Sequence, residues 1–236
     1  GYHAAKLRRY QEMIEEHISG EMNSLFKAVS EAGGDMEKVN PSEFPVLNML
    51  NTRYFIFPLQ GGQTVPLDNP FALGNAWFVD EVQYVNNANE EIAAIHGLNP
   101  LQKAIVDKKF EASVRSMPSD SLATIELVEY QPNYLKYEVN SEKGGTVVFS
   151  EIYYPGWQAY IDGEKVEHGR ANYILRAMNV PAGKHVVEFK FDPDSLYVTE
   201  TIAYIAFALL AIAAIVIVVI SYRQNGKQTL NDASPC

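Results

Sequence analysis

The stretch IAYIAFALLAIAAIVIVVI, residues 202–220, contains no charged residue and is followed by Tyr222 and Arg223. A helix rises about 1.5 Å per residue, so a run of this length covers the roughly 30 Å of hydrocarbon in a bilayer. A helix buried on all sides in a soluble core is the alternative, but a small domain rarely covers so many apolar positions. We therefore expect one membrane-spanning helix over 197–222.

The flanks of this helix bear on its orientation. Arg223 and Lys227 follow it closely, so the positive-inside rule places a tail, 223–236, in the cytoplasm. The charge difference between the two flanks is small, because Lys190 lies on the other flank and acidic residues count for little in that rule. A tail-anchored protein that faces the cytosol therefore stays open as an alternative.

Composition restricts the class of protein. The chain has 236 residues, of which 47% are hydrophobic, so the part before the helix is long enough to build a real core. A formal net charge of −10 argues against nucleic acid as a partner. The single cysteine, Cys236, allows no disulfide within the chain, and the five histidines lack metal-ligand spacing, so we expect no metal and no cofactor. Because Gly1 is not preceded by a signal peptide, we expect a fragment of a longer protein.

Residues 1–120 read as a mixed α/β region. Apolar residues recur at helical spacing over 4–18, and we expect that helix to end at Gly20. A second, weaker helical pattern over 22–29 is expected to stop at Gly33-Gly34. Strands are predicted over 53–57, 76–85 and 104–107, where β-forming residues gather. Asn87, followed three residues later by Glu90, resembles a helix cap.

From residue 121 the pattern changes to strict alternation of apolar and polar residues. The alternating segments are 123–127, 135–139, 157–161 and 187–191, with turn signals such as Asp162-Gly163 between them. Short strands at this spacing are typical of an antiparallel β-sandwich, Ig-like or jelly-roll-like, which we expect over 121–196. The fold class is thus an α+β N-terminal region, then the sandwich, then one C-terminal transmembrane helix, with the sandwich held at the bilayer surface.

No catalytic constellation stands out, but one aromatic segment does. Tyr153, Tyr154 and Trp157 precede a hairpin turn and could form a stacking platform for a sugar ring, with other side chains nearby that could contact hydroxyls or phosphate. The simpler reading is that Trp157 fills the sandwich core, because it shares the strand phase of its apolar neighbours. The candidate carbohydrate-binding residues are Tyr153, Tyr154, Trp157, Arg170, Asn172 and Arg176.

Several motifs resemble one known family. They are Gly1-Tyr2-His3-Ala4-Ala5-Lys6-Leu7-Arg8-Arg9-Tyr10-Gln11, Leu47-Asn48-Met49-Leu50-Asn51-Thr52-Arg53-Tyr54-Phe55-Ile56, Gly74-Asn75-Ala76-Trp77-Phe78-Val79, Tyr154-Pro155-Gly156-Trp157 with Asp162-Gly163, and Pro181-Ala182-Gly183-Lys184-His185. Together they resemble the YfhO-type bacterial membrane proteins, in the form found in Bacteroidetes-like bacteria. The chain looks like the C-terminal extracytoplasmic domain and last helix of such a protein.

The resemblance implies a polytopic membrane protein similar to GT-C glycosyltransferases, which use polyprenyl-phosphate sugars. In that class the catalytic acid lies in an early extracytoplasmic loop that this chain does not contain, so the chain alone is predicted to be non-catalytic. The implied partners are upstream transmembrane helices of the same protein and a glycan or lipid-linked sugar. The implied location is the inner membrane, with the bulk of the chain periplasmic. The second hypothesis is a structural or protein-interaction module without sugar contact.

Overall fold

The computed structural model describes residues 7–231 and, within them, the side chains at all positions except 60, 194 and 222–231. The chain divides into two compact units, Gly1–Asp192 and Pro193–Cys236. The first motif of the family resemblance, up to Lys6, lies outside the described residues.

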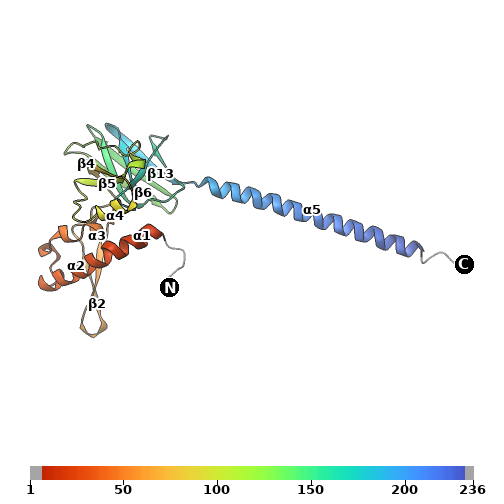
Figure 1. The fold of residues 1–236 in the computed structure, drawn as a ribbon, viewed down its shortest axis with the longest axis horizontal. Coiled ribbons are helices and arrows are strands. Elements are labelled where there is room, and N and C mark those ends of the chain that lie inside the picture. The colour runs from red at the N-terminus through yellow and green to blue at the C-terminus, as the bar shows by residue number, and fades with distance from the viewer. Residues whose placement is uncertain (1–6, 232–236) are drawn as a thin grey trace. The chain divides into compact units, whose positions relative to one another are not determined.

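The first unit begins with one long helical run (Figure 1). It comprises α1 (Arg8–Met13), a π-helical turn (Ile14–Ile18) and α2 (Ser19–Glu31). The prediction that this helix ends at Gly20 was wrong, because Leu25 and Val29 beyond it are buried and keep the following turns in place. The run ends at Glu31, and the predicted stop at Gly33 and Gly34 is confirmed, because their positive φ angles of 68° and 90° suit the end of a helix.

Around α2 lies a small layer of helices and a hairpin. The strands β1 (Tyr54–Pro58) and β2 (Thr64–Asp68) form an antiparallel pair. The first of these strands was predicted from the sequence. Their inner face packs with α3 (Pro45–Met49) on an apolar cluster that includes Phe44 and Phe55. Single 3-10 turns occur at Met36–Lys38, Pro41–Glu43, Gln60–Gly62 and Lys108–Phe110.

A six-stranded sheet forms the middle of the unit. Its strands, in spatial order, are β3 (Ala76–Val79), β8 (Gly145–Ile152), β12 (Leu175–Val180), β11 (Gly169–Ala171), β5 (Lys103–Asp107) and β4 (Glu81–Val85). The pair β4 and β5 is parallel and is joined through α4 (Ala88–Ala93). The predicted cap is confirmed, because the Asn87 side chain accepts a hydrogen bond from the Glu90 backbone amide at 3.0 Å. The predicted strand over 76–85 is interrupted at Asp80 and forms two strands, β3 and β4.

A five-stranded antiparallel sheet packs against the six-stranded one. Its strands, in spatial order, are β10 (Glu164–Val166), β9 (Trp157–Ile161), β13 (Gly183–Phe191), β7 (Tyr134–Ser141) and β6 (Thr124–Gln131). The four alternating segments of the sequence all fall in this sheet, and its inner residues share a core with Val147, Phe149 and Met178 of the other sheet. The expected fold class, an α+β N-terminal region followed by a mostly antiparallel sandwich, is confirmed.

The six-stranded sheet is buried on both faces. Val147 of β8 faces the sandwich core, whereas its neighbour Val148 packs with Met13 of α1 and Met49 of α3. The unit therefore has three layers, with helices, the six-stranded sheet and the five-stranded sheet in that order. The six-stranded sheet contains strands from before and after residue 120, where the sequence predicted a boundary between two regions.

The second unit is one helix, α5 (Asp194–Asn231). Its segment Ser195–Ser221 is 27 residues long, contains Glu200 as its one charged residue and has exposed side chains. It is the only helix among the described residues that is long and apolar enough to cross a membrane, which confirms the expected span. Residues 194–196 are helical, and so is part of the expected tail as far as residue 231. Residues 232–236 lie outside the described residues.

Candidate functional site

Three aromatic rings gather at one end of the sandwich, where β8 leads into β9. Tyr154 is 46% exposed, and Trp157 is half-buried against the core between the sheets. The ring of Phe191, the last residue of β13, lies 6.2 Å from that of Tyr154 and 5.4 Å from that of Trp157. We refer to Tyr154, Trp157 and Phe191 as the aromatic edge.

The loop that carries the aromatic edge is fixed from both sides. The Tyr153 amide donates to the Ile174 carbonyl at 2.7 Å, which attaches the start of the loop to the six-stranded sheet. The Asp192 amide donates to the Gly156 carbonyl at 2.8 Å, which attaches its end to β13. Gly156 has φ 102°, a conformation that disfavours other residues, so the sharp turn depends on glycine. The backbone of the loop is therefore held in place before any ligand arrives.

Arg176 lies directly beneath the aromatic edge. Its side chain projects from β12 into the space between the sheets and is only 2% exposed. The guanidinium carbon lies 4.0 Å from the Trp157 ring centre and 5.1 Å from that of Phe189, so the cation sits between two rings. Its Nε donates to the Ile152 carbonyl at 3.2 Å. The geometry joins a buried positive charge to a partly exposed aromatic surface.

The charge of Arg176 is poorly compensated. Its closest carboxylate is that of Glu151, with 4.0 Å between Nη2 and Oε2, and burial raises the pKa of Glu151. Burial lowers the pKa of Arg176 to about 10, which still leaves the guanidinium charged at neutral pH. Nη1 of Arg176 has no hydrogen-bond partner among the described residues.

Two further unpartnered polar atoms lie around the same Phe189 ring. They are Nε2 of His168, whose ring centre is 5.5 Å from that of Phe189, and the hydroxyl of Tyr137, whose ring centre is 6.3 Å away. Burial, followed by the charge of Arg176, lowers the pKa of His168 to about 4. Burial raises the pKa of Tyr137. Both groups are therefore neutral at pH 7, and Arg176 supplies the positive charge of this cluster.

The remaining predicted site residues lie elsewhere. Arg170 is buried in an ionic cluster, where its Nη2 donates to Glu91 Oε2 at 2.8 Å. Asn172 is fully buried, and its side-chain oxygen accepts from the Ile105 amide at 2.8 Å. The Tyr153 ring packs against Phe110 at 5.4 Å and lies 5.6 Å from the His168 ring, so it borders the cluster around Phe189 without joining the three rings of the aromatic edge. The structure thus brings together Tyr154, Trp157 and Arg176 of the six candidates, and sugar contact by any of them stays a prediction.

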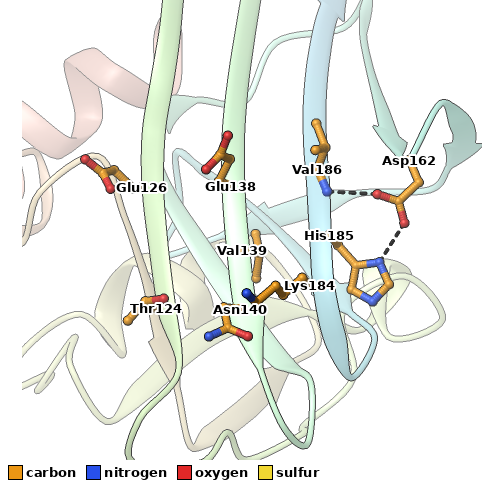
Figure 2. Close-up of a pocket in the computed structure, with 9 residues that line it drawn as sticks. All are labelled: Thr124, Glu126, Glu138, Val139, Asn140, Asp162, Lys184, His185 and Val186. Atoms are coloured by element: carbon orange, nitrogen blue, oxygen red, sulfur yellow. Dashed lines mark hydrogen bonds and ion pairs between the residues drawn. The ribbon is translucent and has the colours of Figure 1, made fainter.

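A hollow of about 450 Å³ lies on the outer face of the five-stranded sheet (Figure 2). Glu126 and Glu138 face each other across β6 and β7, and the Asp162 carboxylate accepts from the Val186 amide at 2.8 Å. His185 Nδ1 lies 2.6 Å from Asp162, and this contact raises the pKa of His185 and helps lower that of Asp162. The hollow is shallow and solvent-facing, and among residues 7–231 no group of three or more His, Cys, Asp or Glu could hold a metal ion.

Sequence reasoning missed the partners of the predicted residues. Phe191 was recognised only as a strand residue, and Glu151 lies in a strand that shows no alternation. Glu91, the acid at the centre of the ionic cluster, follows a helix cap and resembles a solvated helix residue. None of these positions carries a local signal, because each acquires its role from a residue far away in the chain.

Comparison with known proteins bears on the part of the chain that carries the aromatic edge. Residues 104–203 match the family model described as bacterial membrane protein YfhO. No curated protein and no solved structure matches the chain. The motifs before residue 80 that suggested the same family lie outside the matched segment. Residues 104–203, which hold most of the sandwich, Arg176 and the start of α5, are thus similar to the YfhO family of bacterial membrane proteins.

Proposed function

We propose that the first unit is an extracytoplasmic accessory domain that assists transfer of a sugar from a lipid-linked donor to a cell-envelope polymer. It would act in the inner membrane together with the transmembrane helices that the family resemblance implies. The observation that carries this proposal is the aromatic edge, in which exposed Tyr154 lies beside half-buried Trp157 on a loop fixed at both ends.

Sugar rings have an apolar face and a rim of hydroxyls, so they suit a surface that combines flat aromatics with polar groups. Tyr154 and Trp157 provide such rings, and Arg176 lies behind them. A loop whose backbone is fixed in advance loses little backbone entropy when a ligand binds. The chain passes from Phe191 through Asp192 and Pro193 into α5, so the aromatic edge belongs to the part of the unit that is nearest in sequence to the membrane helix.

The contribution of this chain is binding rather than bond-making. Transfer from a lipid-linked donor needs an acid or base within about 3 Å of the acceptor hydroxyl, together with a site for the donor phosphate. The carboxylate beside the aromatic edge, Glu151, is turned toward Arg176. We therefore expect the purified chain, incubated with polyprenyl-phosphate sugars and envelope extract, to transfer no sugar.

Ligand-observed NMR on the full chain in nanodiscs tests sugar binding, with oligosaccharides released from envelope polymers as ligands. Loss of one stacking ring removes about 1 kcal/mol, so Tyr154→Ala should weaken binding roughly five- to tenfold. The matched control is Tyr54→Ala, because Tyr54 is 62% exposed on β1 and lies outside the aromatic edge. Equal binding by both variants and the unaltered chain would refute a role for the aromatic edge.

The β1–β2 hairpin favours the second candidate function, a protein-interaction module. Tyr54 and Ile56 are 62% and 59% exposed on its outer face, and residues 54–67 contain no charged residue. Apolar side chains gathered in this way often mark a protein contact. A photo-crosslinking residue at Ile56, compared in cells with one at exposed Leu122, tests this function. Crosslinks to a protein from position 56 alone would support it, and equal yields at both positions would count against it.

A further inference from the structure

We infer that the site at the aromatic edge takes a sugar bearing an anionic group, phosphate or carboxylate, and that Arg176 binds that group. This inference rests on the proposed function and adds the chemical class of its ligand. It starts from a feature that glycan stacking alone does not explain, namely a buried arginine with unmet hydrogen-bonding capacity.

A buried cation usually has a close carboxylate and a partner for each of its N–H groups, because removing it from water costs several kcal/mol otherwise. Arg176 has one backbone hydrogen bond, a carboxylate at 4.0 Å and no partner for Nη1. Arg170, on the neighbouring strand, meets the Glu91 carboxylate at 2.8 Å. Arg170 also has one unpartnered atom, Nε, so the two buried arginines differ in their carboxylate partners. Arg170 has a carboxylate at hydrogen-bond distance, whereas the carboxylate nearest to Arg176 lies at 4.0 Å and leaves the guanidinium free to accept an anion.

The surroundings of Arg176 select the kind of partner. Nη1 can only donate a hydrogen bond, and the hydroxyl of Tyr137 and the ring of His168 can also donate. These three groups lie around the Phe189 ring without partners among the described residues. Unpartnered donors near a positive charge favour an anionic acceptor, and arginine binds phosphate and carboxylate with two parallel hydrogen bonds.

Trp157 connects this buried cluster to the surface. Its ring lies 4.0 Å from the guanidinium on one side, and it is half-buried, so a rotation of the indole would uncover Arg176 beside Tyr154. A sugar stacked on Tyr154 would then place an anionic substituent over the guanidinium. The chain carries a formal charge of −10, which repels free anions, so such a ligand needs a specific arginine.

Ligand-observed NMR with the full chain in nanodiscs distinguishes the alternatives. Methyl glucoside is the neutral probe, glucose 1-phosphate represents a sugar phosphate and glucuronate represents an acidic polymer unit. We expect at least one anionic probe to bind ten times or more tighter than the neutral probe in low salt. Arg176→Lys, which keeps the charge but loses the fork of donors, should reduce that preference at least threefold, whereas Arg170→Lys should leave it unchanged.

A second variant should change the affinity for the anionic probe in the opposite direction. Glu151→Gln removes the carboxylate that partly holds Arg176, so it should strengthen binding of the anionic probe three- to tenfold, and it keeps the test decisive if Arg176→Lys does not fold. Equal binding of neutral and anionic probes by the unaltered chain would overturn this inference and leave sugar stacking intact. A preference that survives in Arg176→Lys would also overturn it. Failure of every probe to bind would overturn the proposed function as well.

Discussion

Replacing Glu91 with alanine should destabilise the first unit by about 4 kcal/mol. The Glu91 side chain is fully buried, and its Oε2 accepts from Arg170 at 2.8 Å and from Arg9 at 3.0 Å, while Oε1 accepts from the Tyr173 amide at 3.2 Å. The carboxylate therefore joins α1, α4 and the turn between β11 and β12. That turn is strained, because Asn172 and Tyr173 both have positive φ angles, of 48° and 72°.

The magnitude follows from what the deletion leaves behind. Arg170 has a side chain only 6% exposed and would keep only Asp107, at 3.8 Å, as a carboxylate partner, and breaking such a buried pair costs about 3–5 kcal/mol. Arg9 is 29% exposed and can turn to water, so its share is within about 1 kcal/mol. Glu91→Gln preserves the shape and the acceptor for Tyr173 and should cost about 2 kcal/mol.

Denaturant unfolding of the full chain in nanodiscs, followed by near-UV circular dichroism, measures these losses. The control is Glu81→Ala, because the ion pair of Glu81 with Lys103 at 3.1 Å is largely exposed and should contribute within about 1 kcal/mol. Glu91→Leu combined with Arg170→Met should recover at least half of the loss, since an apolar pair replaces the buried charges. A loss from Glu91→Ala no larger than that of the control would refute the reasoning.

Two further predictions concern the aromatic edge and the cluster beneath it. Trp157→Ala should lower the free energy of unfolding by about 3 kcal/mol, because the ring is half-buried and covers Arg176. Tyr154→Ala should lower it by no more than about 1 kcal/mol. Equal, small losses in denaturant unfolding would contradict the packing of Trp157. His168 has a pKa of about 4 in the folded chain against 6.5 in the unfolded chain, so the unfolded state binds more protons between these values and stability falls as the pH drops from 6.5 to 4. Over that window the unaltered chain should lose more stability than His168→Gln, by on the order of 2–3 kcal/mol, and parallel stability curves for the two proteins would contradict a buried neutral histidine.

The alternating pattern predicted one sheet of the sandwich and missed most of the other for a physical reason. β7 and β13 have one face in the core and one in solvent, so apolar and polar residues alternate along them. β8 and β12 lie between two layers, and both of their faces are buried over most of their length, which removes the alternation. The helix end expected at Gly20 was wrong for a related reason, because tertiary packing of Leu25 and Val29 outweighs the local cost of Gly20.

The residues of the candidate site could be predicted from the sequence, but the contacts between them could not. Tyr154, Trp157 and Arg176 were identified because aromatic and basic residues cluster within one short segment of the sequence. The position of Arg176 beneath Trp157, and the engagement of Arg170 by Glu91, depend on contacts between residues 19 and 79 positions apart. Local patterns contain no information about such contacts, so the sequence could not separate the arginine at the aromatic edge from the one in the ionic cluster.

The central claim is that the unit carrying the aromatic edge faces the outside of the cell, where an envelope polymer can reach it. Labelling with a membrane-impermeant thiol reagent tests this most directly. Cys236 is the only cysteine of the chain, so it reports the C-terminal end, and Leu122→Cys in a Cys236→Ser background reports the first unit at a position 77% exposed. We predict that position 122 reacts in intact cells and that Cys236 reacts only after permeabilisation. Reaction of Cys236 in intact cells, with position 122 protected until permeabilisation, would contradict the account.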